Sequence, residues 1–177
     1  MRSIQKKEVL AKLLLMKSTG NHVNEHLFKA VDSSNALFLI SLEDKATFLS
    51  LIWQTINQSR LLTPNYESRI LYDVTKRMLE NSWTFKKLSA NLGLPKNQHN
   101  PEWFRTCFEI DKKFDFERFG WITIVPAKNC EQTESPKGSF YIYDGVHKSL
   151  VLSKRLLRNE TEFQPIEALY ILPRPEK

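Results

Sequence analysis

The chain has 177 residues, which is enough for one domain with a small helical appendage. Its composition, 41% hydrophobic and 26% charged, excludes an intrinsically disordered chain, and no apolar run approaches the about 18 residues of a membrane-spanning helix. The net charge of +6 favours an anionic partner such as a nucleotide or nucleic acid. We therefore expect a globular protein with no membrane partner.

The two cysteines, Cys107 and Cys130, have no motif spacing. They predict no disulfide framework and suit a reducing compartment, so we expect a cytoplasmic protein. The first residues are basic and partly apolar, but they include no uncharged hydrophobic segment of the kind found in secretory signals. An amphipathic helix over residues 4–17, ended by Gly20, is the better interpretation.

Residues 21–34 are polar and end in a loop cluster, and residues 1–34 together are predicted to form a mostly helical N-terminal extension. The apolar run 36–42, ALFLISL, predicts a short buried strand. Ser41, with Asp44 three residues later, resembles a capping box and predicts a helix that continues to Ile56.

Three further helical segments are expected in the middle of the chain, over residues 66–80, 83–91 and 102–108. Gly93 marks the end of the second, and Asn100 followed by Pro101 predicts the N-cap and first residue of the third. We interpret residues 43–110 as a helical insertion in a domain that spans residues 35–177.

The C-terminal third has a different pattern. Two β-prone runs, 121–125 and 139–143, flank a polar hairpin loop at 128–138. A helix then opens at residues 146–149 and runs to Leu157, and a last strand is expected at 165–172. This β-β-α-β order, added to the helical first two thirds, predicts an α+β fold with a small mixed sheet.

The turn between the second strand and this helix carries the candidate chemistry. A helix N-terminus exposes backbone N–H groups and the positive end of the helix dipole, which is where proteins hold phosphate. Gly145 lets the backbone approach a phosphate, while His147, Lys148 and Ser149 can add charge or hydrogen bonds. Asp144 can orient His147 or hold Mg²⁺. An ordinary turn with a solvent-facing histidine and lysine is the blander alternative.

The residues 121–125, 140–156 and 165–172, with the signature Asp144-Gly145-Val146-His147-Lys148, resemble the ParB/sulfiredoxin superfamily. The resemblance implies a mixed-sheet fold and a loop, Gly145 to Ser149 with Val146 included, that cradles the phosphates of ATP or another NTP. It also implies catalytic roles for Asp144 and His147, with Mg²⁺ at Asp144. Sulfiredoxins carry a cysteine where this chain has Val146, so thiol chemistry is not expected.

Two classes of function follow. The first is an NTPase of this type that also binds or cleaves DNA, with Lys86, Lys87, Lys154 and Arg155 as DNA contacts. The second is a non-catalytic DNA- or protein-binding inhibitor encoded on a plasmid or other mobile element. Residues 85–105 resemble the start of a helix-turn-helix, although helices packed in a core are the more ordinary interpretation.

Overall fold

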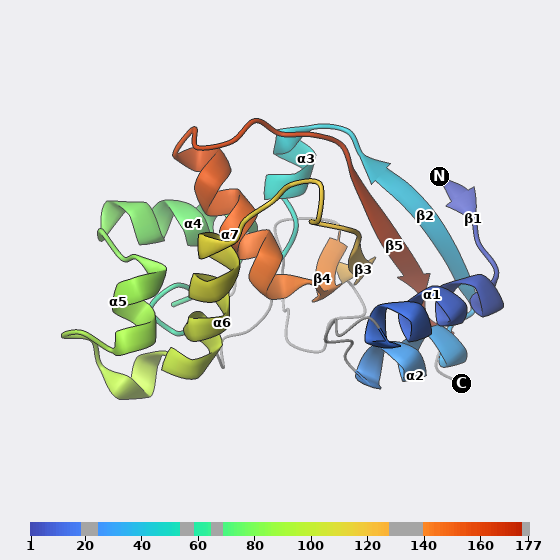
Figure 1. Ribbon diagram of the computed structural model, residues 1–177, viewed down its shortest axis with the longest axis horizontal. Coiled ribbons are helices and arrows are strands. Elements are labelled where there is room, and N and C mark those ends of the chain that lie inside the picture. The colour runs from blue at the N-terminus through green and yellow to red at the C-terminus, as the bar shows by residue number, and fades with distance from the viewer. Residues whose placement is uncertain (19–24, 54–58, 65–68, 128–139, 175–177) are drawn as a thin grey trace.

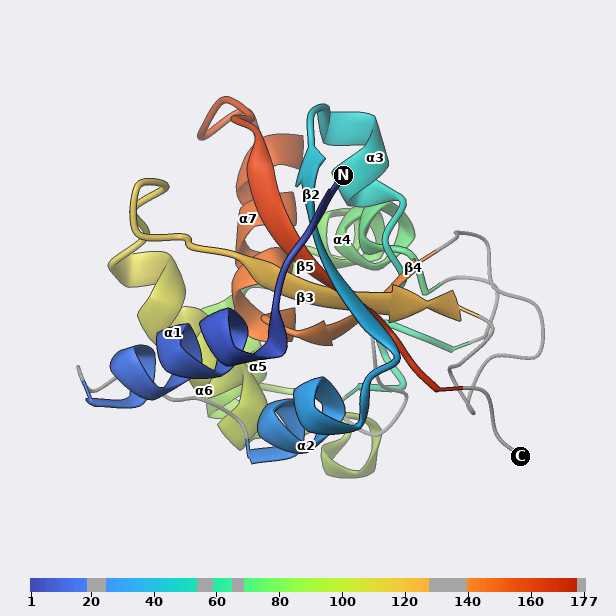
Figure 2. The ribbon, with the colours of Figure 1, turned by 90° about the vertical axis from the view of Figure 1, so that its right-hand side faces the viewer.

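The computed structural model describes residues 1–18, 25–53, 59–64, 69–127 and 140–174. Within these ranges, five strands form one sheet with helices packed on both of its faces (Figure 1), so the predicted α+β class is confirmed. Figure 2 shows helices α1 and α2 on the viewer's side of the molecule and helices α4–α7 behind the strands.

The sheet has the strand order β1-β2-β5-β3-β4. Its strands are β1 (Arg2–Ser3), β2 (Ala36–Leu42), β3 (Ile122–Pro126), β4 (Phe140–Asp144) and β5 (Ile166–Leu172). Among the described strands, β3 and β5 pair in parallel and the other neighbours are antiparallel. The four strands expected from the sequence are confirmed to within a residue or two at each end, whereas β1 was not predicted.

Alternating side chains of the strands enter two separate cores. In β5, Ile166 and Ala168 pack with the helices α4–α7, whereas Leu169 and Ile171 pack with α1 and α2. A strand that is covered on both faces reads as a continuous apolar run rather than as an alternating one. This explains why β5 and β2 are almost entirely apolar.

The helices are α1 (Lys6–Ser18), α2 (Glu25–Ser33), α3 (Lys45–Leu49), α4 (Leu71–Glu80), α5 (Phe85–Ala90), α6 (Pro101–Lys112) and α7 (Val146–Leu157), with a 3₁₀ turn, η2, at Lys96–Gln98. The first two thirds of the chain therefore contain most of the helices, as expected. The loop expected at 128–138 lies outside the described residues.

Helix α3 differs from its prediction at both ends. Asp44, rather than Ser41, is the N-cap, because its carboxylate accepts a hydrogen bond from the Thr47 backbone N–H. Ser41 instead pairs with Glu167 inside the sheet. The helix ends at Leu49 rather than at Ile56, and residues 54–58 lie outside the described part of the chain.

The described parts of residues 1–34 join the same sheet as the rest of the chain and form the core on one of its faces. Arg2 and Ser3 pair with Leu39 and Phe38 of β2. The polar stretch 21–34 includes α2, whose Leu27 and Val31 lie four residues apart and are buried against the sheet. The sequence did not predict the bounds of α2, because two apolar residues on one helical face are a weak helical pattern in so polar a segment.

The predicted cap of α6 is confirmed. The side chain of Asn100 accepts hydrogen bonds from the backbone N–H groups of Glu102 and Trp103, at 3.1 and 3.3 Å. Pro101 occupies the first turn, where a missing N–H costs nothing. The helix then continues to Lys112, four residues past its predicted end, and so brings Asp111 beside α7.

Candidate functional site

The strand–turn–helix expected around Gly145 is present. Strand β4 ends at Asp144, and Gly145 begins α7 with a φ of +87°. A Cβ at Gly145 would lie 2.9 Å from Cε of Lys148 and 3.0 Å from Cγ2 of Ile122. Only glycine fits here, because both the backbone conformation and the surrounding space exclude a side chain.

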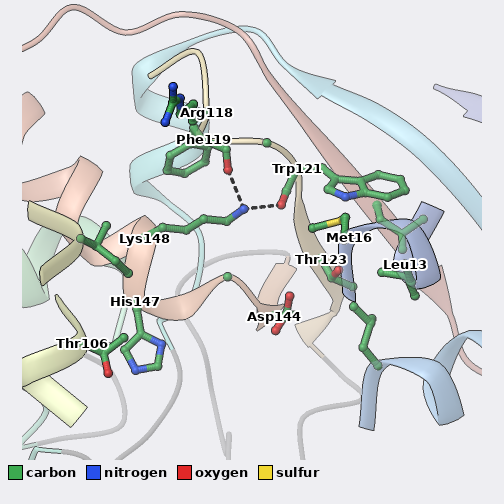
Figure 3. A pocket seen from close by; sticks show the side chains of 15 residues that line it. Leu13, Met16, Thr106, Arg118, Phe119, Trp121, Thr123, Asp144, His147 and Lys148 are labelled. Carbon is green, nitrogen blue, oxygen red and sulfur yellow. Dashed lines mark hydrogen bonds between the residues drawn. The ribbon is translucent and has the colours of Figure 1, made fainter. Parts of the chain in front are cut away.

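The amino end of α7 opens into a cleft of ≈ 710 Å³ (Figure 3). The cleft lies between α1, α6, the turn that precedes β3, and the β4–α7 turn. Its lining residues are Leu13, Met16, Leu27, Thr106, Ile110, Arg118, Phe119, Gly120, Trp121, Thr123, Asp144, Gly145, His147, Lys148 and Leu169. Four predicted site residues, Asp144, Gly145, His147 and Lys148, therefore line one cleft.

Lys148 is held by the backbone of the opposite wall. Its Nζ donates hydrogen bonds to the carbonyl oxygens of Phe119 and Trp121, at 2.7 and 2.6 Å, and lies 5.0 Å from the centre of the Phe119 ring. Burial lowers the pKa of Lys148 to about 8, an effect that the carboxylate of Asp144 opposes. Lys148 thus fastens α7 to the turn before β3 rather than extending freely toward a phosphate.

His147 lies on an aromatic surface of α6. Its ring stacks on Trp103 with 4.1 Å between centroids and 22° between planes. Trp103 in turn makes edge-to-face contacts with Trp53 and Phe104, at 5.5 and 5.0 Å. In Figure 3 the His147 ring points toward Thr106, away from the Lys148 amine. This stacking fixes the position of the imidazole at the mouth of the cleft.

Asp144 is the last residue of β4 and pairs in register with Thr123 of β3, so both side chains reach the cleft. Among the described residues, no cluster of three or more His, Cys, Asp or Glu side chains is placed to hold a metal ion. Mg²⁺ is commonly bound by one or two carboxylates together with substrate phosphates and waters. Asp144 on its own fits that mode of binding.

Two members of the predicted phosphate loop do not line the cleft. Ser149 is fully buried, and its hydroxyl donates to the carbonyl oxygen of Gly145 at 2.9 Å. Val146 is partly buried and packs against the core formed with the helices α4–α7. The hydroxyl that was expected to reach a phosphate is therefore used inside the helix.

The predicted DNA-contacting residues of α7 are also engaged in the fold. Asp111 of α6 accepts hydrogen bonds from Nζ of Lys154 and Nε of Arg155, at 2.7 and 2.8 Å, and the Lys154 side chain is only 8% exposed. Lys86 and Lys87 of α5 are exposed. Lys154 therefore offers little surface to DNA, and both Lys154 and Arg155 are paired within the fold.

Sequence reasoning missed Arg118 and the apolar wall of α1. Arg118 lines the cleft with an 87% exposed side chain and pairs with Asp115 at 3.3 Å. Leu13 and Met16 of α1 lie opposite the α7 turn. Gly120 stands immediately before a β-prone run and so indicates a turn before β3. The neighbouring sequence does not indicate that this turn faces α7.

The cysteine in the described residues is no candidate nucleophile. Cys107 is fully buried, and burial raises the pKa of its thiol well above the usual value, with Asp111 adding to the effect. Cys130 lies outside the described residues. No helix in the described ranges has the length and apolar character needed to cross a membrane.

Comparisons of the chain with protein-family models, with curated proteins and with solved structures find no match. The resemblance to the ParB/sulfiredoxin superfamily therefore stays a prediction that rests on the signature Asp144–Lys148 and on the order of the surrounding elements.

Proposed function

We propose that the cleft binds the phosphate groups of ATP or another NTP, and that the protein is an NTPase of ParB/sulfiredoxin type that also binds or cleaves DNA. The observation that carries the proposal is that the amino end of the 12-residue helix α7 opens into the ≈ 710 Å³ cleft, whose wall also carries Arg118. A helix dipole that opens into the cleft favours an anion, and Arg118, an exposed cation at the rim that also pairs with Asp115, adds positive charge nearby.

Backbone groups would supply most of the phosphate contacts. The hydrogen bond from Ser149 N to Gly145 O is the first of the helix, so a phosphate at the amino end of α7 would be recognised by the backbone of the turn that precedes it. Arg118 would add a bidentate donor from the opposite wall. Lys148 would contribute its charge at longer range, because its amine is already bonded to Phe119 and Trp121.

The side chains of Asp144 and His147 would have different roles in hydrolysis. Asp144 can accept a proton from an attacking water or hold a metal ion, and His147, fixed by its stacking on Trp103, can hydrogen-bond to a phosphate oxygen. When bound, Mg²⁺ would supply positive charge that stabilises the departing phosphate. The apolar wall of Leu13 and Met16 would contact the less polar part of the nucleotide.

A non-catalytic protein-binding role is the second candidate, and one feature of α1 favours it. Leu14 and Leu15 are 59% and 64% exposed on the helix that also forms a wall of the cleft. Exposed leucines beside a cleft suit a protein partner better than they suit DNA. In that case, nucleotides would bind weakly or not at all.

Thermal-shift and calorimetric titrations with ATP, CTP and GTP, each with and without Mg²⁺, test the proposal. A nucleotide at about 100 times its Kd adds about 2.7 kcal/mol to the stability of the fold. Arg118→Ala should weaken binding about 10- to 100-fold through the loss of one charge-assisted contact. Arg105→Ala is the matched control, because Arg105 is also exposed and also pairs with an acid three residues earlier.

Two results would contradict the proposal. One is the absence of a shift with any of the three nucleotides. The other is equal binding by the Arg118→Ala and Arg105→Ala variants. If a nucleotide does bind, release of inorganic phosphate by Asp144→Asn, compared with the wild-type protein, tests hydrolysis separately from binding.

A further inference from the structure

A second pocket, of ≈ 430 Å³, lies between α1, the turn that precedes β3 and the start of β5. A volume of this size is typical of sites that bind small molecules. The pocket adjoins the cleft at the amino end of α7, because both are lined by Met16, Phe119, Gly120 and Trp121. Its other lining residues have no part in the proposed function.

Three aromatic side chains line this second pocket, those of Phe116, Phe119 and Trp121. The rings of Phe116 and Phe119 stack with 5.8 Å between their centroids. Trp121 is buried in the core that α1 and α2 form on one face of the sheet. These contacts hold the rings in place, and the face of an aromatic ring attracts a cation through the negative charge of its π-system.

The ammonium of Lys12 lies over one of these rings, with Nζ 3.9 Å from the centre of the Trp121 ring. Four other cations of the described residues also lie over rings, and each of them is also bonded to a carbonyl or carboxylate oxygen: Lys112, Lys148, Lys154 and Arg155. In the same part of the chain, no oxygen forms a hydrogen bond or an ion pair with Lys12. The face of Trp121 alone therefore holds an ammonium here.

Two carboxylates line the same pocket. Glu117 belongs to the turn before β3. Glu167 shares one face of β5 with Leu169 and Ile171, which pack against α1 and α2, so it also faces α1. Neither carboxylate forms an ion pair with another described residue, and Nζ of Lys12 reaches neither of them. The pocket thus carries two negative charges and one positive charge, which favours a further cation.

We propose that this pocket binds a small quaternary ammonium compound such as choline, and that Lys12 covers its aromatic face until the compound binds. A quaternary ammonium is larger than the ammonium of lysine and spreads its charge over several methyl groups. One such group can therefore contact the Trp121 ring and approach Glu117 or Glu167 at the same time. It is also less strongly hydrated than a primary ammonium, so it favours an aromatic surface over water.

Lys12 is able to leave the ring when the compound binds. Lys12 is exposed, and its flexible four-carbon stem lets the ammonium move into the solvent. While it lies over Trp121, it competes with any other cation for the same face. A cation–π contact at an exposed site should weaken the binding of a competing cation by about 2- to 5-fold.

Titration of the full chain with choline, followed by the indole N–H signals in NMR spectra, tests the proposal. The chain has four tryptophans, and Trp121→Phe identifies the signal of Trp121. Choline should move this signal, and the Kd of Lys12→Ala should be about 2- to 5-fold lower than that of the wild-type protein. Lys7→Ala is the matched control, because Lys7 is an exposed lysine of α1 that does not line the pocket. Sodium chloride at equal concentrations controls for ionic strength.

Two further comparisons test the proposal even if Trp121→Phe fails to fold. Glu167→Gln should weaken choline binding by about 2- to 5-fold, whereas Glu162→Gln, at an exposed position outside the pocket, should not change it. The alcohol 3,3-dimethylbutan-1-ol has the shape of choline without its charge and should bind more weakly. Equal binding of the two compounds, or equal Kd values for Lys12→Ala and Lys7→Ala, would overturn the proposal. Neither result depends on whether a nucleotide binds.

Discussion

Replacing Gly145 by alanine tests how tightly the β4–α7 turn is constrained. The residue has a φ of +87°, and its new Cβ would lie 2.9 Å from Cε of Lys148 and 3.0 Å from Cγ2 of Ile122. The backbone conformation alone costs a non-glycine residue about 1–2 kcal/mol. Forcing an extra methyl group into a filled space costs about 1–3 kcal/mol more. We therefore expect Gly145→Ala to lower the free energy of unfolding by about 2–5 kcal/mol.

Gly93→Ala is the matched control for this substitution. Gly93 also has a positive φ, +70°, but no atom lies within 4 Å of the Cβ that alanine would add. The free energy of unfolding of Gly93→Ala should therefore fall only by the cost of the backbone conformation, about 1–2 kcal/mol. The effect of alanine on the unfolded chain is similar at both positions, so it cancels in the difference between the two variants. The remaining difference, about 1–3 kcal/mol, measures the crowding against Lys148 and Ile122.

Urea denaturation of the three proteins gives these free energies, provided that the slopes agree. A difference of 1 kcal/mol corresponds to about 2–4 °C in Tm for a chain of this length. If Gly145→Ala loses no more than Gly93→Ala, the turn has room for a side chain. The close approach of the backbone to Lys148, and with it the argument for a glycine at this position, would then be wrong.

Two further predictions concern buried charges. Asp111→Ala leaves the ammonium of Lys154 buried without its carboxylate and should lower the free energy of unfolding by about 3–5 kcal/mol. Glu109→Ala, which removes an exposed pair with Lys112, should lower it by less than about 1 kcal/mol. Equal losses of the two variants in urea denaturation would contradict this prediction. Because burial lowers the pKa of Lys148 to about 8, the unfolded chain binds more protons between pH 8 and about 10.5. The wild-type protein should therefore gain about 3 kcal/mol of stability relative to Lys148→Met across that range, and parallel pH profiles of the two proteins would refute the shift.

Most of the strands could be predicted because the pattern of each depends only on residues that are adjacent in the sequence. The runs 36–42 and 165–172 are short, apolar and bounded by turn residues, which is the pattern of a strand covered on both faces. The cap at Asn100 was likewise local, since it depends on two adjacent residues. Strand β1 was missed because two residues, Arg2 and Ser3, carry no periodicity, and they pair with Leu39 and Phe38 of β2, far along the chain.

The roles of the basic residues were not predictable from the sequence, because they depend on partners far along the chain. Lys154 and Arg155 are a basic pair on a helix, which favours a solvated or DNA-binding face until α6 brings Asp111 against them. Lys148 follows a histidine in the signature Asp144–Lys148, yet Phe119 and Trp121 accept two of its hydrogen bonds. In both cases the sequence identifies the charge but not the group that it meets.

These partners change which atoms can recognise a ligand. The hydroxyl of Ser149 and two donors of Lys148 are used within the fold. Under the proposed function, the signature would therefore recognise a phosphate mainly through its backbone N–H groups and the side chain of His147. Backbone groups recognise a phosphate but do not distinguish one nucleotide from another. Selectivity must then come from the rest of the cleft, where Leu13 and Met16 face the α7 turn. Because both belong to α1, the N-terminal segment that resembled an appendage in the sequence would select the ligand.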